Sequence, residues 1–524
     1  MVMRNHITNS IYNIGVKKHL FSHQLINIPR FSYKNLNSSK SMDSSFILFF
    51  SLALVIILSI SIIITRLTRS AWCSCAICQS YVDSQWRSRF TNLSDWHTHL
   101  LQSSPSRTVH IHVTNNVITA NPANVEYILQ TKFHNFPKGK PFSSILADFL
   151  GRGIFNADGD TWRFQRKMAG LELARASLRA YALEVVHHEI HRCLIPAVDS
   201  ASREKGVLDL QDVFRRFSFD CICRFSFGVD PTCLELSDFE AAFDVASRLS
   251  AERAMAASPL VWRAKRWLGV GSERRLRRAV ADVDALAEEV IRQRRRFGSA
   301  GRRDLLSRFM DSVSDETYLR DIIVNFLLAG RDTVGSALTS FFWLAARHPG
   351  VEAAILEEAD RVMGVGNSRI TEYEEMRGFH YLHAAVHESM RMYPPVQFDS
   401  KFCLEDDVLP DGCPVKKGTR VTYHPYAMGR IEEIWGPDWA DFKPERWLRD
   451  RVFCQENPYK YPVFQGGVRV CLGKEMALLE VESVALALLR EYRVELIDYR
   501  PVPVFSPGLT ATYRDGLPVL VHRR

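Results

Sequence analysis

Apolar residues recur with the period of a helix through most of the chain between residues 160 and 395. The clearest helical segments are 272–297, 318–347 and 379–392. His348-Pro349-Gly350 follows the second segment and Pro394-Pro395 follows the third, and proline cannot continue a helix. This part of the chain is therefore predicted to be mainly helical.

Strand-like alternation replaces this pattern in short stretches near both ends. Residues 108–120 alternate around Asn115-Asn116, which predicts a β-hairpin, and a helix is expected to start at 121. Short strands are expected around Pro410-Asp411-Gly412, and residues 507–524 have a similar hairpin pattern. The predicted fold class is mainly α with small β-sheets.

A third pattern is the uncharged run from residue 46 to residue 64. A run of this length can cross a hydrocarbon core of about 30 Å as one helix. Arg66 and Arg69 follow it, so the positive-inside rule places the rest of the chain in the cytosol. No convincing cleavage site follows, and we therefore expect a transmembrane anchor over 42–69.

Residues 1–41 form an extension with two possible interpretations. They contain no Asp or Glu and are rich in Ser and Asn, a composition typical of an organelle transit peptide. Alternatively, Met42 is the true start, because it would leave a conventional short lumenal tail before the hydrophobic run. We favour the second interpretation.

Composition adds little to this picture. The chain has 524 residues, of which 46% are hydrophobic, enough for a large core. Its net charge of +8 is modest, and its basic residues cluster locally, which argues against a nucleic-acid-binding protein. Its 11 cysteines follow no disulfide framework and are expected to be reduced thiols.

Cys73, Cys75 and Cys78 lie close together in the segment 70–94, which is expected to be a linker. They could bind zinc, although no partner pair with finger-like spacing follows them. Cysteines beside a membrane can also be palmitoylated. A third interpretation, three thiols without a special role, is the one we favour.

The segment "FQGGVRVCLG", residues 464–473, points to specific chemistry. Cys471 precedes a predicted helix, where free backbone N–H groups favour a thiolate, and a single thiolate can hold haem iron. Gly467 would make the turn, Gly473 would let the helix approach a porphyrin, and Arg469 could pair with a propionate. A buried structural cysteine is the simpler alternative, but the spacing of these residues with Phe464 argues against it.

This segment resembles the haem-binding loop of the cytochrome P450 superfamily, and four further family elements follow the expected order over 95–524. The resemblance implies a cytochrome P450 fold with haem b, O2, and NADPH electrons from a separate NADPH–cytochrome P450 reductase. It also implies an endoplasmic reticulum membrane protein, anchored by one span with its catalytic domain in the cytosol. Gly466 departs from the alanine frequent in plant relatives, and a proline-rich hinge after the anchor is missing.

The other matching elements imply roles for further residues. In "AGRDTVGS", Asp332 and Thr333 are expected to manage protons for oxygen activation. In "TWRFQRK", Trp162 and Arg166 are expected to bind the propionates. A structural trio, in which one buried carboxylate is held by two guanidinium groups, is expected from Glu388, Arg391 and Arg446.

The apolar segments around 136–155, 393–402 and 505–513 resemble the plant fatty-acid ω-hydroxylases, and within them the enzymes that oxidise jasmonoyl-isoleucine. We therefore expect a monooxygenase that oxidises the ω-end of a small apolar carboxylate. A substrate role is expected for the carboxylate-binding Lys138 and Lys140 and for Phe142, Phe398 and Leu509, which would narrow the channel.

The sequence leaves three alternatives to this function. The first is a general ω-hydroxylase for cutin- or suberin-type lipids. The second is a haem enzyme that rearranges hydroperoxides without a reductase, but such enzymes typically lack the acid–threonine pair seen here. The third is a membrane-tethered binding protein, which leaves the C-terminal motifs unexplained.

Overall fold

The computed structural model describes the chain at Ser51 and over residues 73–230, 237–256, 259–297, 304–364 and 373–524. The chain divides into two compact units, Met1–Ala71 and Trp72–Arg524. The extension 1–41 and, apart from Ser51, the anchor 42–69 lie outside the described residues, and both stay predictions. Within the described ranges, no helix is both long and apolar enough to cross a membrane.

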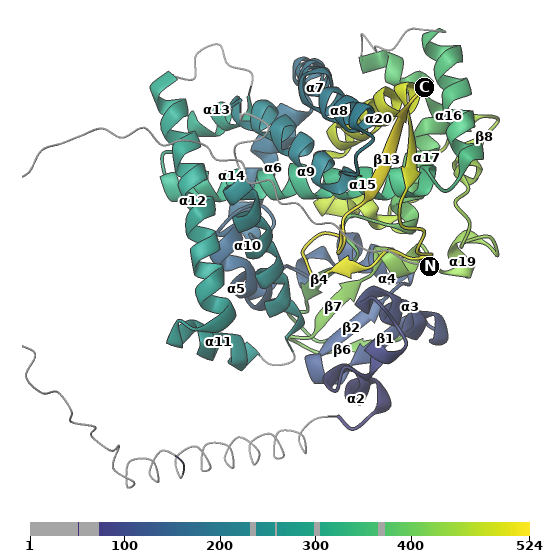
Figure 1. Cartoon of the computed structure of the whole chain (residues 1–524). Helices are drawn as coiled ribbons and strands as arrows, with labels where there is room; N and C mark the ends of the chain where they lie inside the picture. Colours follow the sequence, from purple (N-terminus) through teal and green to yellow (C-terminus); the bar gives the residue numbers. More distant parts are fainter. Residues whose placement is uncertain (1–50, 52–72, 231–236, 257–258, 298–303, 365–372) are drawn as a thin grey trace, which may run out of the picture. The chain divides into compact units, whose positions relative to one another are not determined.

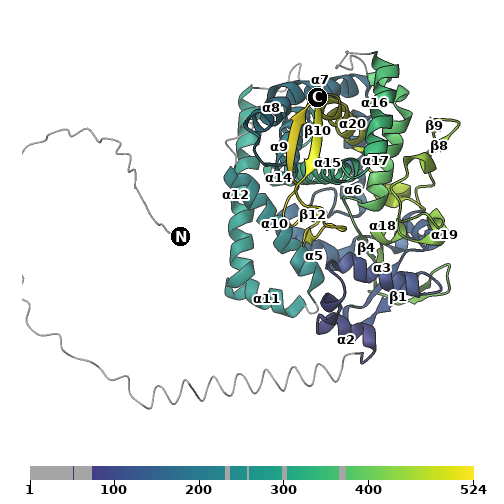
Figure 2. The same ribbon diagram turned by 45° about the vertical axis from the view of Figure 1, so that its right-hand side comes forward.

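The second unit is mainly helical, as predicted (Figures 1 and 2). Its longer helices are α3 (Leu93–Ser103), α5 (Gly139–Leu150), α6 (Gly159–Leu173), α7 (Ala176–Glu189), α8 (Ile195–Glu204), α9 (Leu210–Ile222), α10 (Ser237–Met255), α11 (Pro259–Leu268), α12 (Gly271–Phe297), α14 (Glu316–Leu327), α15 (Thr333–Ala345), α16 (Pro349–Met363), α17 (His380–Met392) and α20 (Lys474–Glu491). The short ones are α2 (Ala76–Val82), α4 (Pro122–Glu126), α13 (Leu305–Met310), α18 (Pro425–Met428) and α19 (Glu432–Trp435).

Several 3₁₀ and π turns connect these helices. They are η1 (Gln85–Ser88), η2 (His112–Thr114), η3 (Tyr127–Thr131), η4 (Phe133–Asn135), η5 (Ile190–Leu194), η6 (Cys223–Phe227), η7 (Leu328–Asp332), η8 (Tyr373–Gly378), η9 (Pro444–Trp447), η10 (Pro462–Phe464) and η11 (Gly467–Arg469). The segments predicted over 272–297 and 379–392 correspond closely to α12 and α17.

The segment predicted as one helix over 318–347 is continuous but changes its winding in the middle. α14 passes into the π-helical turn η7, and α15 then continues to Ala345. π-helical turns are rare in proteins, and those that occur are often found at functional sites. Gly330 lies in this turn, and a Cβ added there would overlap the side chain of Ile222 on α9. Glycine therefore serves the close packing of α9 against the turn.

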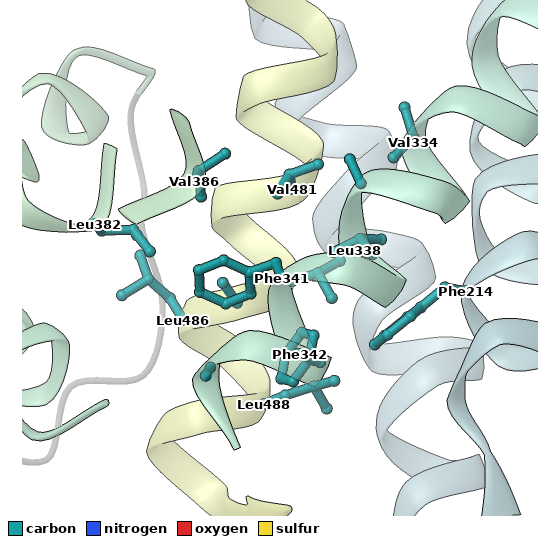
Figure 3. Close-up of a cluster of buried hydrophobic side chains, with 14 of the residues drawn as sticks. Phe214, Val334, Leu338, Phe341, Phe342, Leu382, Val386, Val481, Leu486 and Leu488 are labelled. Carbon is teal, nitrogen blue, oxygen red and sulfur yellow. The ribbon is translucent and has the colours of Figure 1, made fainter. Parts of the chain in front are cut away.

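The core is built around α15, all of whose residues from Val334 to Ala345 are buried. Figure 3 shows its side chains Leu338, Phe341 and Phe342 packed among residues of α9, α17 and α20. Because α15 is buried on every side, its sequence is apolar throughout rather than amphipathic.

Small sheets complete the unit. The largest has the strand order β1 (Thr108–Ile111), β2 (Asn116–Thr119), β7 (Arg420–Tyr423) and β4 (Asp399–Phe402). A three-stranded sheet has the order β10 (Tyr492–Leu496), β13 (Pro518–Arg523) and β3 (Leu208–Asp209). The remaining strands pair as β11 (Phe505–Ser506) with β12 (Thr512–Tyr513), β5 (Asp407–Val408) with β6 (Pro414–Val415), and β8 (Leu448–Arg449) with β9 (Val452–Phe453). The antiparallel β1–β2 pair confirms the predicted hairpin, with Asn115 at a positive φ of 46°.

Two expectations differ from the structure. The hairpin pattern over 507–524 is not one hairpin, because β12 pairs with β11 whereas β13 pairs with β10 over five residues. β13 is longer and its first four residues alternate in burial, so pairing with the five-residue strand β10 forms more ladder hydrogen bonds than pairing with the two-residue β12 would. The segment 70–94, expected to be a linker, is folded from Cys73 onward, since it contains α2 and η1 and its Cys78 is buried.

One fully buried carboxylate ties the C-terminal half together. Glu388 on α17 accepts hydrogen bonds from Arg391 at 2.8 and 2.9 Å, from Arg446 Nε at 2.8 Å and from Trp447 Nε1 at 2.8 Å. The Lys443 backbone N–H adds a fifth bond at 3.1 Å. The structure thus brings together the three residues expected to form a structural trio.

Glu388→Ala is expected to lower the free energy of unfolding by about 3–5 kcal/mol, because the buried Arg391 guanidinium would lose its counter-charge and Arg446 would keep only the partly exposed Asp438. Urea unfolding of the purified protein measures the change. Glu374→Ala is a matched control, since Glu374 and Arg377 form a pair with the same spacing in which both side chains are exposed. That variant should lose no more than about 0.5 kcal/mol. Equal losses in the two variants would contradict the role of Glu388.

Candidate active site

The loop that carries Cys471 is shaped by its glycines. Gly467 has a φ of +58°, and a Cβ there would overlap the carbonyl oxygen of Leu129 in η3. The chain then turns through η11, and the Cys471 backbone N–H donates to the Phe464 carbonyl at 2.7 Å. α20 begins three residues after the cysteine, with Gly473 as its N-cap. The turn thus presents the thiol just before the N-terminus of a long buried helix.

Cys471 opens onto a cavity of about 300 Å³. Its thiol is accessible to this hollow although protein encloses it closely on its other sides, and that burial raises the pKa of the thiol. The Gly473 backbone N–H and the charges of Arg166 and Lys474 act in the opposite direction. A metal ion at the thiol would displace the proton, because the thiolate is the form that binds metals.

Most of the cavity wall is apolar. One wall comes from the continuous helix α14–η7–α15, the central helix, through Ala329, Gly330 and Thr333. Another wall, next to Cys471, comes from α20. The remaining apolar lining includes Ile154, Phe155, Phe326, Pro395 and Val396. A flat apolar ring with one metal-binding thiol beside it suits this surface.

One end of the cavity is cationic. Arg166, Arg469, Lys138 and Lys401 all line it, together with the indole of Trp162. Arg469 lies 4.4 Å from the Trp162 ring centre and pairs with Asp158 at 2.5 Å. Its buried Nε has no hydrogen-bond partner in the described structure. A buried donor without an acceptor is costly, and a carboxylate in the cavity would satisfy it.

Asp399 balances part of this positive charge. Its carboxylate binds Lys138 at 2.6 Å and Lys401 at 2.7 Å and accepts from the Tyr423 hydroxyl at 2.9 Å. Burial acts to raise the pKa of Asp399, but the two lysine charges prevail and hold it well below its usual range. Asp399 and Lys401 were missed in the sequence, although alternate charged residues in a buried strand were a usable signal.

The two residues expected to manage protons occupy different environments. Thr333 lines the cavity, and its hydroxyl donates to the Ala329 carbonyl one turn earlier. Asp332 is buried but is not among the lining residues, and it pairs with Arg331 at 2.8 Å. Arg331 also binds Asp244 at 2.9 Å, which is partly exposed. Asp332, next to Thr333 in the chain, is therefore linked through Arg331 to the partly exposed Asp244.

The structure corrects the expected position of one of the two substrate lysines, Lys138. Lys138 is buried in its ion pair with Asp399 at the cationic end, so it is not a free donor at a channel mouth. Lys140 is exposed and does not line the cavity. The sequence could not show this, because the partner of Lys138 lies 261 residues away.

The three expected channel residues do not line this cavity. Phe142 and Leu509 pack against one hydrophobic cluster, and the Lys138 ammonium lies 4.3 Å from the Phe142 ring centre. Phe398 lies 5.4 Å from the ring of His424. Their roles in substrate selection stay predictions.

The donor set fits haem. A single thiolate can hold haem iron, the apolar walls would suit a porphyrin, and the cationic end would offer donors to its carboxylates. Cys471 would hold the iron, while Arg166, Trp162 and Arg469 would hold the carboxylates. The fold and this site together define a haem-thiolate oxygenase.

Comparison with known proteins gives the family. The family model described as Cytochrome P450 matches residues 84–514. The chain belongs to the cytochrome P450 family and is a monooxygenase that uses haem b, O2 and electrons supplied from NADPH by a reductase.

Within the family, the chain is similar to Cytochrome P450 94C1 of Arabidopsis thaliana, with 57% identity over 87% of this chain and 95% of the relative. It is also similar to Cytochrome P450 94A2 of Vicia sativa, with 44% identity over 82% and 87%. The crystal structure of the cytochrome P450DA heme domain has a TM-score of 0.66 at 21% identity, covering 78% of this chain and 88% of that one. This last likeness concerns the fold alone.

Asp399→Asn is expected to destabilise the haem-free protein by about 3–5 kcal/mol, because Lys138 and Lys401 would be buried without a counter-charge. The loss should be smaller with haem bound, since a propionate would supply negative charge. Urea unfolding with and without haem measures both values. Asp406→Asn is the control, since Asp406 forms an exposed pair with Lys416.

The same variant predicts a pH dependence. A carboxylate with a lowered pKa stabilises the fold above its unfolded pKa of about 3.9, and that stability is lost as the pH falls toward the folded value. The difference between wild type and Asp399→Asn should therefore be constant from about pH 7 to 5 and shrink below about pH 4. A difference that grows on acidification would contradict the ionised pair.

Proposed function

We propose that this monooxygenase oxidises the ω-end of fatty-acid-type carboxylates, including jasmonoyl-isoleucine or its 12-hydroxy form, to a 12-carboxy product. The observation that carries the proposal is the cavity lined by both Cys471 and Thr333, whose walls are largely apolar. Two further supports are the similarity to Cytochrome P450 94C1 and the resemblance of the apolar segments to ω-hydroxylases.

The cavity favours an apolar substrate for a simple energetic reason. Each buried CH₂ group contributes about 0.8 kcal/mol when it leaves water. Phe155, Phe326 and Val396 offer such surface, whereas the cationic end would be occupied by the carboxylates of haem. An acyl chain would therefore approach along the apolar walls, with its own carboxylate kept away from the reacting end.

Haem b, when bound, supplies the activation of O2 and the transfer of one oxygen atom to a C–H bond. The Thr333 hydroxyl lies on the cavity wall, where it would hold a water or donate a proton within the site. Asp332 would resupply that proton; it pairs with Arg331, which in turn binds the partly exposed Asp244. The apolar lining would exclude other water, which limits proton leakage.

Terminal oxidation also requires positional control. Terminal C–H bonds are stronger than internal ones, so the protein must present the chain end first. Because Lys138 is engaged by Asp399, it would act on the cofactor side and not as an anchor for the substrate. Lys140 remains the proposed anchor, and its exposed position would lower the cost of binding a carboxylate.

We also propose attachment to the endoplasmic reticulum membrane, with the reductase as partner. Besides the uncharged run 46–64, α11 supports contact with a bilayer. Its exposed apolar residues include Leu260 at 70% and Trp267 at 86% exposure, and it also carries Arg263, Lys265 and Arg266. Exposed Trp and Leu beside basic residues are typical of helices that lie in a membrane interface.

Turnover with four substrates tests the proposed function. The full-length protein, with reductase and NADPH, is given jasmonoyl-isoleucine, its 12-hydroxy form, lauric acid and oleic acid. We expect ω-oxidised products from each, with kcat/KM roughly tenfold higher for the jasmonate conjugates, a difference of about 1.4 kcal/mol. Equal kcat/KM values would favour a general fatty-acid ω-hydroxylase. Conversion of a hydroperoxide without NADPH would contradict a monooxygenase.

Thr333→Ala should reduce product formed per NADPH roughly tenfold, because oxygen would be reduced without ordered proton delivery, while substrate affinity changes little. Product and peroxide measured per NADPH consumed give this coupling. Thr339→Ala is a matched control, since Thr339 makes the same bond to a carbonyl one turn earlier on α15 but does not line the cavity. Unchanged coupling in Thr333→Ala would remove this residue from the mechanism.

A further inference from the structure

Four potential metal ligands meet at the N-terminal edge of the second unit, away from the active site. They are Cys73, Cys75, Cys78 and His112, and their ligand atoms all lie within 4.8 Å of one another. The Cys73 Sγ lies 3.6 Å from the His112 Nδ1. The cysteines are free thiols, and none of the four residues lines the catalytic cavity.

Local structure places each ligand. Cys75 is the N-cap of α2, and Cys78 lies within the first turn of that helix. His112 begins η2, directly after β1, so the β1–β2 register determines its position. The Val113 backbone N–H donates to the Cys78 Sγ at 3.4 Å. Such hydrogen bonds to ligand sulfur are typical of metal sites, where they orient the ligand.

α2 is held against this hairpin independently of any metal. Cys78 is buried in the N-terminal hydrophobic cluster, and Tyr81 packs on Trp96 with ring centres 6.1 Å apart. The Tyr81 hydroxyl also donates to the Met255 carbonyl at 2.9 Å. The four ligands are therefore brought together by packing, which leaves the site preformed.

The donor set selects the metal. Three thiolates and one imidazole form a Cys₃His set, which is typical of structural zinc and is closed to substrate. With Zn–S of about 2.3 Å and Zn–N of about 2.0–2.1 Å, a tetrahedral site has a sulfur–nitrogen edge of about 3.6 Å. The Cys73–His112 separation equals this value. Three thiols would also leave one unpaired if two formed a disulfide.

We propose that Cys73, Cys75, Cys78 and His112 bind one structural zinc ion. The ion would join the first residues of the described unit to the β1–β2 hairpin, 39 positions along the chain. It would thereby fasten the segment that follows the predicted anchor onto the largest sheet. This function is separate from the monooxygenase reaction.

Sequence alone indicated three of the four ligands of this site. The three cysteines were recognised as a possible zinc site, but a second pair with finger-like spacing was missing. The fourth ligand is a single histidine, which only the packing of α2 on the hairpin identifies. The structure thus changes the interpretation of these thiols.

Metal analysis of the full-length holoprotein in detergent tests the proposal. After purification with added zinc and dialysis, we expect about one zinc per chain in addition to haem iron. X-ray absorption at the zinc edge should show three sulfurs at about 2.3 Å and one nitrogen at about 2.0 Å. Less than about 0.2 zinc per chain, or a shell of oxygen and nitrogen only, would overturn the proposal.

Variants then identify the ligands. Cys75→Ser and His112→Ala should each lower zinc content at least tenfold while the carbon monoxide spectrum of the haem is kept. Because the His110 ring centre lies 4.1 Å from that of His112, the double variant with His110→Ala excludes replacement of one histidine by the other. His112→Cys should retain zinc with a four-sulfur shell. Zinc loss in His112→Ala but not in His112→Cys would then reflect the missing ligand and not a failure to fold.

Cys454→Ser and His99→Ala are the matched controls, since Cys454 is a free thiol and His99 an exposed histidine, both outside the cluster. Both should keep zinc. Zinc retained in Cys75→Ser and His112→Ala as well as in the controls would show adventitious metal elsewhere and overturn the proposal. Acyl groups found by mass spectrometry on these cysteines in place of zinc would do the same.

Discussion

The buried charge of Glu388 is the constraint on which the C-terminal half of this protein depends. Four residues donate five hydrogen bonds to it, and two of these residues, Arg391 and Arg446, extend the network to backbone carbonyls of Gly429, Asp441, Trp435 and Asp438. These hydrogen bonds attach the irregular segment between α17 and the cysteine loop to α17 itself. Because a buried charge without partners is costly, this part of the chain has few alternative arrangements.

The active site inherits its geometry from that arrangement. The Tyr461 hydroxyl donates to the His387 carbonyl, one residue before Glu388, and Phe464 follows three positions later at the start of the cysteine loop. Thr333, the first residue after the π-helical turn η7, lines the same cavity as Cys471. The thiol and the hydroxyl thus face one space from elements that are each fixed by packing.

Charge is distributed unevenly around this space. Apolar side chains form most of the wall, whereas two lysines and two arginines gather at one end with Asp399 and Asp158 as partners. Such a distribution orients a cofactor that is apolar in its ring and anionic at its edge. The substrate then meets only apolar walls. These walls select a class of substrate, apolar molecules, and do not by themselves select one member of that class.

Local sequence determined the elements and the reactive residues. Period 3.6 predicted α12, the central helix and α17, and the Asn115 turn predicted the β1–β2 hairpin, because these depend on neighbours along the chain. The spacing around Cys471 was likewise sufficient to predict haem-thiolate chemistry. Tertiary structure alone decided that Lys138 pairs with Asp399, that β13 leaves β12 for β10, and that His112 joins three distant cysteines. Each of these depends on partners far apart in the chain, which periodicity and motif spacing do not encode.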